Sequence, residues 1–214
     1  MQLDAHHRFV PGRDDFLRAE LARCPARDPI LTAYLPWFFR KPDGRETFCP
    51  LAGPRLEFSH FDADGVLSVK APVVETAEDA APTAGVFVSA HFLFARGDFV
   101  TRVPYDPALY YAGEEIALAT RAFTHGCEIF HPARAPGWHL CAPADFARHW
   151  DADPAWPALQ ARSLADYEAR CDLDLRTALH PPGTKALPPG EARGGSPQPL
   201  PAGVAATLAA GSGR

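Results

Sequence analysis

The segment between Gly113 and Pro132 constrains the fold most, because it encodes a helix, a stop signal and a strand in direct succession. Two glutamates follow Gly113, and the helix dipole favours carboxylates in a first turn. Apolar residues then recur at the spacing of one helix face, namely Ile116, Ala119 and Phe123. Gly126 suits the end of this helix, and residues 127–130 predict a short strand that stops before Pro132.

Other segments predict further strands and helices. Residues 86–94 are apolar enough to lie inside a sheet, and residues 30–34 predict a buried strand that ends before Pro36. The other predicted elements are a strand end at 3–10, a hairpin over 56–61 and 66–69, and helices at 14–24, 146–149 and 159–171. This alternation of strands and helices indicates the α/β class.

The length of 214 residues suits one domain with a tail. Hydrophobic residues make up 47% of the chain and charged residues 22%, which is enough to build an ordinary core. From Pro181 onward Pro, Gly, Ala and Ser dominate, a composition typical of disorder. We therefore predict a folded domain over residues 1–180 and a disordered tail over residues 181–214.

The charge and cysteine content narrow the class of protein. The formal net charge is −5 and no dense Lys/Arg run occurs, which argues against a nucleic-acid or anionic-membrane partner. No apolar stretch reaches the ~18 residues of a membrane span, and the opening residues do not resemble a signal peptide. The five cysteines are scattered and none forms Cys-x-x-Cys, so we expect reduced thiols and a cytoplasmic location.

The opening residues contain an acid and a histidine two positions apart, Asp4 and His6. If residues 3–6 are extended, both side chains point to one side and can share a divalent ion. Mixed oxygen and nitrogen ligation suits manganese, suits magnesium less well, and also fits zinc. The simpler alternative is a capping aspartate beside a surface histidine.

Two other places offer chemistry. Glu114 and Glu115 begin a predicted helix, where they either satisfy free backbone N–H groups or place a carboxylate that binds a sugar hydroxyl or acts as a base. His139 follows a tryptophan after a proline-rich turn. It is either a packed core residue or a remote ligand that completes a metal site with the opening residues. His91, on the apolar stretch, is expected to be a core or cleft-lining residue.

Four stretches occur in a distinctive order: LDAHHRFVPG, PILTAYLPWF, VPYDPALYYAGEEIALATRAFTHGCEIFHP and GWHL. Together they resemble the GlcNAc glycosyltransferase family, whose members include a hydroxyproline-linked polypeptide N-acetylglucosaminyltransferase. The long third stretch is the most specific. The opening Asp-Ala-His resembles the family's Asp-Ser-His, its form of the acidic metal motif of GT-A glycosyltransferases. The resemblance covers residues 3–141.

The resemblance implies a GT-A-like mixed sheet flanked by helices. It also implies transfer of N-acetylglucosamine, with retention of anomeric configuration, from UDP-GlcNAc to a hydroxyl of a protein or glycan, such as hydroxyproline. Asp4 and His6 would bind Mn²⁺ or Mg²⁺ at the donor diphosphate, and His139 would be the third ligand. Such a cation stabilises the negative charge that develops on the leaving diphosphate.

The resemblance also assigns other residues to the site. Glu114 and Glu115 would be catalytic groups in the donor-sugar or acceptor region. The implied substrate-binding residues are Arg8, Asp106 and Gly113. Arg8 would pair with an acid or face phosphate, and Asp106 would shape the pocket or stabilise its own turn. Arg121 is expected to make a structural ion pair.

In GT-A enzymes the metal motif follows the nucleotide-binding half, whereas here it stands at the start of the sequence. We therefore expect that the N-terminal nucleotide-binding half is missing, that the metal-motif strand has an exposed edge, and that this chain alone binds the donor poorly. Two alternatives remain open. One is a non-catalytic remnant that acts as a binding module, and the other is a metal-dependent hydrolase that uses Asp4, His6 and His139.

Overall fold

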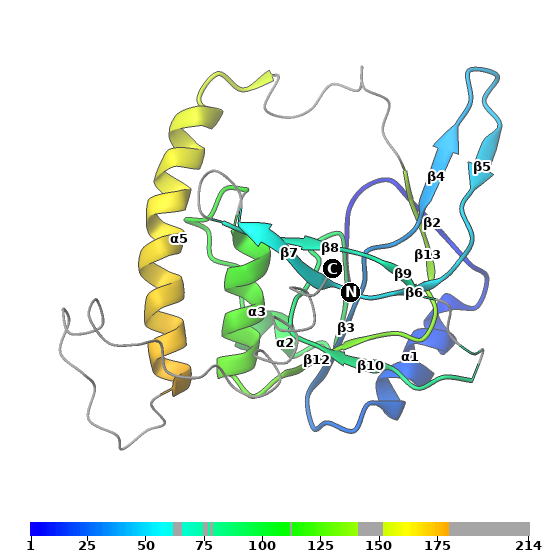
Figure 1. Ribbon diagram of the computed structural model, residues 1–214, viewed down its shortest axis with the longest axis horizontal. Helices are drawn as coiled ribbons and strands as arrows, with labels where there is room; N and C mark the ends of the chain where they lie inside the picture. The colour runs from blue at the N-terminus through cyan, green and yellow to red at the C-terminus, as the bar shows by residue number, and fades with distance from the viewer. Residues whose placement is uncertain (62–65, 75–76, 78, 112, 141–151, 180–214) are drawn as a thin grey trace.

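Two mixed sheets form the frame of the structure, and helices pack against them (Figure 1). The computed structural model describes residues 1–61, 66–74, 77, 79–111, 113–140 and 152–179. The predicted α/β class is confirmed, because the described part of the chain combines several β-sheets, two of them mixed, with a few helices. The predicted helix at 146–149 and the predicted tail over 181–214 lie outside the described residues.

The larger sheet has five strands in the order β1-β11-β3-β12-β10. Its strands are β1 (Gln2–Leu3), β11 (Phe92–Phe94), β3 (Pro29–Thr32), β12 (Glu128–His131) and β10 (Thr83–Gly85). The β3–β12 pair is parallel, and the other pairs are antiparallel.

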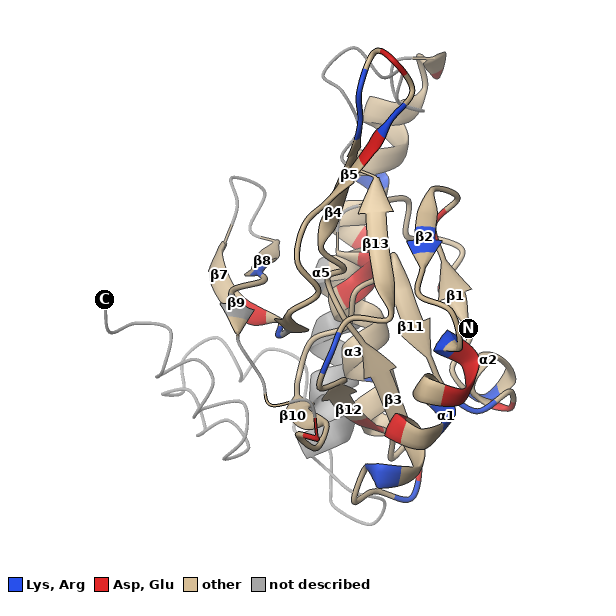
Figure 2. Ribbon diagram, turned by 90° about the vertical axis from the view of Figure 1, so that its right-hand side faces the viewer, with Lys and Arg blue, Asp and Glu red and all other residues tan. Residues whose placement is uncertain are grey.

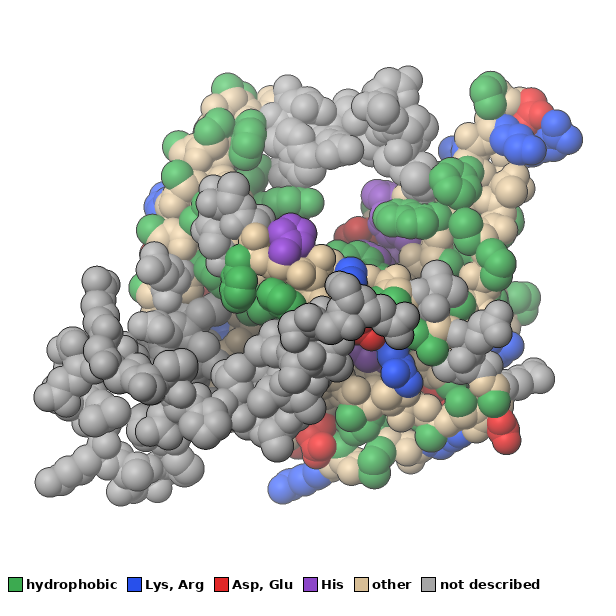
Figure 3. All heavy atoms as spheres, viewed as in Figure 1, with side chains coloured by type: hydrophobic (Ala, Val, Ile, Leu, Met, Phe, Trp, Pro, Cys, Tyr) green, Lys and Arg blue, Asp and Glu red, His purple; other side chains and the backbone are tan. Residues whose placement is uncertain are grey.

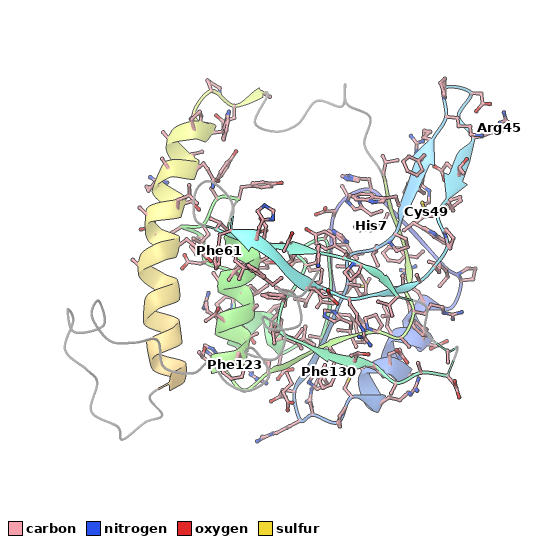
Figure 4. The ribbon with its side chains drawn as sticks, viewed as in Figure 1. His7, Arg45, Cys49, Phe61, Phe123 and Phe130 are labelled. Atoms are coloured by element: carbon pink, nitrogen blue, oxygen red, sulfur yellow. The ribbon has the colours of Figure 1, made fainter. Side chains whose placement is uncertain are left out.

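The smaller sheet has four strands in the order β2-β13-β4-β5. Its strands are β2 (His7–Phe9), β13 (Gly137–Leu140), β4 (Trp37–Arg40) and β5 (Glu46–Phe48). The β13–β4 pair is parallel, and the β2–β13 and β4–β5 pairs are antiparallel. The β4–β5 hairpin projects from the body of the molecule, with Arg45 at its tip (Figure 4).

Three linkers carry the chain from the larger sheet into the smaller one. Residues 4–6 join β1 to β2, residues 33–36 join β3 to β4, and residues 132–136 join β12 to β13. We call these three linkers the seam. Two of them end in proline, at Pro36 and Pro136, and proline cannot donate to a strand ladder. The sequence thus interrupts the strands where they change sheets.

Helices cover both faces of the larger sheet. The helices are α1 (Arg13–Arg23), α2 (Phe99–Arg102), α3 (Glu114–Thr124) and α5 (Trp156–Leu179), and α5 runs alongside α3 (Figure 1). Ile30 and Ile129 belong to the apolar core under α3, whereas Leu31 and Phe130 pack with Leu17 of α1. Successive strand residues face opposite sides, so both faces are apolar. Each such buried side chain stabilises the fold by about 1.5–3 kcal/mol.

Two small antiparallel sheets complete the fold. One pairs β6 (Gly53–Pro54) with β9 (Val73–Val74), and the other pairs β7 (Glu57–Phe61) with β8 (Leu67–Lys70). The β7–β8 pair confirms the hairpin predicted over 56–61 and 66–69. No helix within the described residues has the length and apolar character that crossing a membrane requires.

The helix–stop–strand segment has the predicted elements, but the predicted apolar face is only partly buried, because Phe123 is 54% exposed. The buried residues of α3 are Ala117, Leu118, Ala119 and Ala122. Gly126 adopts a φ of 77°, the left-handed conformation that favours glycine. Its N–H donates to the carbonyl of Phe123 at 2.9 Å, and the Cys127 N–H donates to the carbonyl of Ala122 at 2.9 Å. These two bonds satisfy carbonyls at the end of α3, and β12 begins directly afterwards at Glu128.

The continuous strand predicted over 86–94 is wrong. β10 ends at Gly85 and β11 begins only at Phe92. Between them, the Ser89 N–H donates to Oγ1 of Thr32 at 2.8 Å and the Ala90 N–H donates to Oε1 of Glu115 at 2.7 Å. Side chains therefore satisfy backbone groups that a strand would pair in its ladder.

The strand end predicted over 3–10 is confirmed in part: the linker at 4–6 divides this range into β1 and β2. The helix at 14–24 and the strand at 30–34 are confirmed as α1 and β3 with small shifts of their ends. The predicted helix at 159–171 lies inside the longer α5. Our sequence reasoning missed the β4–β5 hairpin.

Candidate active site

The three predicted metal ligands come together at the seam. Asp4 and His6 lie in the linker between β1 and β2, and His139 lies in β13. One ligand atom from each residue lies within 4.8 Å of the other two. Nε2 of His139 is 3.3 Å from Oδ2 of Asp4. Residues separated by more than 130 positions in the sequence thus offer one carboxylate and two imidazoles to a common point.

Strand pairing explains this convergence. In the β2–β13 ladder His139 pairs with His7, the residue that follows His6. Gly137 pairs with Phe9 in the same ladder, and a Cβ at Gly137 would collide with the carbonyl oxygen of Arg8. Glycine at this position therefore permits the close approach of β13 to β2 that brings His139 to the opening segment.

The donor set fits a divalent cation. Burial, together with the nearby His7 and His6, lowers the pKa of His139, so its imidazole is neutral at neutral pH. A neutral imidazole has the lone pair that a metal needs. Two imidazole nitrogens and one carboxylate oxygen suit Mn²⁺ or Zn²⁺ better than Mg²⁺. Asp4 is exposed and His6 and His139 are half-buried, so solvent or a ligand can reach the site.

Aromatic rings surround His139. The ring centre of His6 lies 4.7 Å from that of His139, and the ring centre of His7 lies 5.0 Å from it in an edge-on arrangement. His91 stacks on it at 4.9 Å with planes 26° apart, and Trp37 meets it edge-on at 5.3 Å. Histidine side chains gather beside an acidic side chain on the face shown in Figure 3. The ring of His139 is therefore held by its neighbours.

The two predicted catalytic glutamates begin α3, as the sequence indicates. Gly113 precedes them with a φ of 87°, and a Cβ at Gly113 would lie 2.6 Å from Cδ2 of Tyr167 on α5. The carboxylate of Glu115 accepts the Ala90 N–H at 2.7 Å, which fixes this side chain against the start of the segment that leads to His91. Gly113 thus has a conformational and packing role at the start of the helix.

Electrostatics join the glutamates to the predicted metal ligands. Burial, the Glu115 charge and the Asp4 charge raise the pKa of Glu114 to about 7. Burial and the Asp4 charge also raise the pKa of Glu115. Because the charge of Asp4 contributes to both shifts, Asp4 lies close enough to the two glutamates to interact with them electrostatically. A carboxyl with a pKa near neutrality can exchange a proton at physiological pH.

The comparison with protein families matches residues 1–177 to the family described as Glycosyltransferase (GlcNAc). The chain belongs to the GlcNAc glycosyltransferase family. No curated protein and no solved structure matches it. The resemblance inferred from the four sequence stretches is confirmed, and the protein is a glycosyltransferase, with a sugar donor and an acceptor as its substrates.

Arg8 of this glycosyltransferase pairs with an acid, which is the first of the two roles predicted for it. Its guanidinium donates to both carboxylate oxygens of Glu46, at 3.0 and 2.8 Å, and lies over the ring of Phe38. Arg40 also pairs with Glu46, at 3.2 Å. Basic and acidic residues thus alternate along the β4–β5 hairpin (Figure 2). Arg8 supports the hairpin beside the site.

Asp106 and Arg121 have local structural contacts. Oδ1 of Asp106 accepts the Ala108 N–H at 2.9 Å, a bond that stabilises its own turn. Whether Asp106 also shapes the glycosyltransferase pocket stays a prediction. Nη1 of Arg121 donates to the carbonyl of Pro104 at 2.6 Å, and Arg121 has no ion pair within the described part of the chain.

Sequence reasoning missed two residues that lie beside the candidate metal ligands. His7 and Trp37 both contact His139, and Trp37 is 45% exposed. The adjacency of His7 to His6 was a signal for the first, whereas Trp37 reaches the site only through β4–β13 pairing. His91, predicted as a core or cleft-lining residue, is buried and lines the site. The three cysteines whose side chains are described, Cys24, Cys49 and Cys127, are free thiols, in line with the sequence.

Proposed function

We propose that this glycosyltransferase transfers N-acetylglucosamine from UDP-GlcNAc to a hydroxyl group of a protein acceptor, with hydroxyproline as the candidate side chain, in a reaction that needs a divalent cation. The observation that carries the proposal is the convergence of Asp4, His6 and His139 on one point. The family supports the transfer chemistry, and the donor set supports a metal that holds a diphosphate.

The three ligands would hold Mn²⁺ or Mg²⁺, which as a Lewis acid stabilises the charge on a diphosphate leaving group by several kcal/mol when bound. Asp4 supplies the anionic oxygen of the site. His6 and His139 would supply nitrogen donors, and the lowered pKa of His139 favours the neutral ring, which has one unprotonated nitrogen. The rings of His7 and His91 pack against the ring of His139.

The carboxylates of α3 would act on the hydroxyl groups. Glu115 is already oriented by the Ala90 N–H and is suited to accept a hydrogen bond from a sugar hydroxyl. Glu114, with a pKa of about 7, is suited to receive the proton that the acceptor hydroxyl loses on transfer. Oxocarbenium character at the sugar also benefits from the negative charge of these groups.

Donor turnover tests the proposal. The chain would be incubated with Mn²⁺, a hydroxyproline peptide and either UDP-GlcNAc or UDP-glucose, and UDP release and peptide mass would be measured. Because this chain alone is expected to bind the donor poorly, we expect slow release and a partial mass gain with UDP-GlcNAc at high concentration. Both should be lost in EDTA and in Asp4→Asn, and both should be unchanged in His60→Ala, whose exposed side chain lies on β7. Transfer that survives EDTA and Asp4→Asn would contradict metal dependence. Turnover of UDP-glucose alone would contradict the donor.

A further inference from the structure

Two buried ring nitrogens beside the seam, Nε2 of His7 in β2 and Nδ1 of His139 in β13, have no hydrogen-bond partner among the described residues. We propose that His7 is the positioning residue of the metal site, accepting a hydrogen bond from Nδ1–H of His139 when Nε2 of His139 binds the cation. The inference rests on the proposed function, because it assumes that the Asp4, His6 and His139 site binds a metal.

The proton of His7 is assigned by its environment. Nδ1 of His7 lies 2.9 Å from the carbonyl oxygen of Asp4. A carbonyl can only accept, so Nδ1 of His7 carries the proton and donates it. Nε2 of neutral His7 then carries a lone pair and no proton. This atom is buried and accepts no hydrogen bond, and a buried acceptor without a partner destabilises the fold by about 1–3 kcal/mol.

His139 supplies the missing donor once it binds a metal. Without a cation, its Nε2 lies 3.3 Å from the Asp4 carboxylate, which favours a proton on Nε2 and leaves Nδ1 as a second lone pair. If Nε2 held the cation, the one proton of the neutral His139 ring would stand on Nδ1. Metal-bound histidines almost always donate their other ring N–H to an acceptor, which fixes the ring and raises its basicity.

The geometry favours His7 as that acceptor. His7 and His139 are directly paired residues of the β2–β13 ladder, so their side chains leave the same face of the sheet. Their ring centres are 5.0 Å apart and their planes are 70° apart, so that an edge of one ring meets the other. Figure 4 shows His7 near the four-stranded sheet and well separated from Phe123 on α3.

The other rings around His139 do not offer an acceptor. His91 presents its face, because the two planes are only 26° apart, and its Nε2 already accepts the Leu35 N–H at 2.9 Å. Trp37 carries only an N–H donor. His6 is itself a proposed ligand. Each histidine of the cluster thus has a separate role, and the role of His7 is to orient His139.

Mn²⁺ titration followed by EPR tests this role with two complementary variants. His7→Asn keeps an amide N–H near the position of Nδ1, which can donate to the Asp4 carbonyl, but removes the acceptor at the position of Nε2. His7→Gln places an amide oxygen near Nε2 and loses the donor at Nδ1. We expect His7→Asn to weaken Mn²⁺ binding about 10- to 100-fold and His7→Gln to recover most of this loss. The control His60→Gln should bind Mn²⁺ like the wild type.

The outcomes separate this inference from the proposed function. If the wild type does not bind Mn²⁺, the metal site itself is wrong and the role of His7 falls with it. If the wild type binds Mn²⁺ and His7→Asn binds equally well, only the role of His7 is refuted. If His7→Gln loses affinity and His7→Asn keeps it, His7 acts through the Asp4 carbonyl instead.

A second measurement on the wild type does not depend on the folding of any variant. Long-range ¹H–¹⁵N NMR spectra with diamagnetic Zn²⁺ report which ring nitrogen carries each proton. We expect Nδ1 of His139 to be protonated and Nε2 to be metal-bound, and we expect His7 to be protonated at Nδ1 only. Ligation of His139 through Nδ1, or a proton on Nε2 of His7, would overturn the inference.

Discussion

Replacing Gly113 by alanine tests whether the start of α3 is fixed by its contact with α5. Gly113 has a φ of 87°, and a non-glycine residue in the left-handed region costs about 1–2 kcal/mol. A Cβ there would also lie 2.6 Å from Cδ2 and 2.8 Å from Cγ of Tyr167, closer than packed atoms allow. Overpacking of this kind adds about 1–3 kcal/mol. The expected loss of unfolding free energy is therefore about 2–5 kcal/mol.

Gly12→Ala is the matched control, because Gly12 also begins a helix, has a φ of 72° and has no atom within 4 Å of its Cβ position. It should lose only the conformational part, about 1–2 kcal/mol. At about 2–4 °C per kcal/mol for a chain of this size, thermal unfolding followed by circular dichroism resolves the difference. In a Tyr167→Ala background, Gly113→Ala should cost about as much as Gly12→Ala. Equal costs in the wild-type background would refute the Tyr167 contact.

Two further predictions concern buried carboxyl groups. The pKa of Glu114 rises from 4.5 to about 7 on folding, so its ionisation destabilises the metal-free chain as pH rises between these values, and Glu114→Gln removes that loss. Between pH 5 and pH 8, denaturation in EDTA should show that the unfolding free energy of Glu114→Gln rises by about 1–2 kcal/mol relative to that of the wild type. This value is smaller than the full pKa shift would give, because the Glu114 side chain is partly exposed. A difference between the two proteins that does not change with pH would refute the raised pKa. Glu20 is 2% exposed and accepts the Ala133 N–H and an Arg23 N–H, each at 2.8 Å. Glu20→Leu should lower the unfolding free energy by about 3 kcal/mol, and Glu20→Gln, which keeps an acceptor, should cost clearly less; equal losses in urea denaturation would exclude the Ala133 bond as the cause.

Local signals in the sequence were enough to predict several elements of the fold. The helix of α3 follows from apolar spacing and from Gly126, whose left-handed conformation ends it. The apolar run at 86–94 led to the wrong prediction of a continuous strand, because apolar residues alone do not show which groups its backbone N–H and C=O groups bond to. There the partners are Thr32 and Glu115, side chains remote in the sequence. Contacts of this kind are set by the tertiary fold and leave no local pattern.

The candidate site was predictable in its residue types but not in its geometry. Asp4 and His6 were expected to share one face of a strand, whereas they lie in the linker between two sheets. They meet His139 because β2 pairs with β13, a pairing that the sequence alone does not specify. His7 meets His139 through the same pairing, whereas Trp37 meets His139 through the pairing of β4 with β13. The family resemblance supplied the connection that local spacing lacked.

The convergence of Asp4, His6 and His139 on one cation is the central claim, and anomalous diffraction from crystals of the wild-type chain soaked in Mn²⁺ tests it most directly. We predict a manganese peak within bonding distance of one carboxylate oxygen of Asp4, a ring nitrogen of His6 and Nε2 of His139. A manganese peak bound elsewhere, or the three side chains well ordered with no peak between them, would contradict the account.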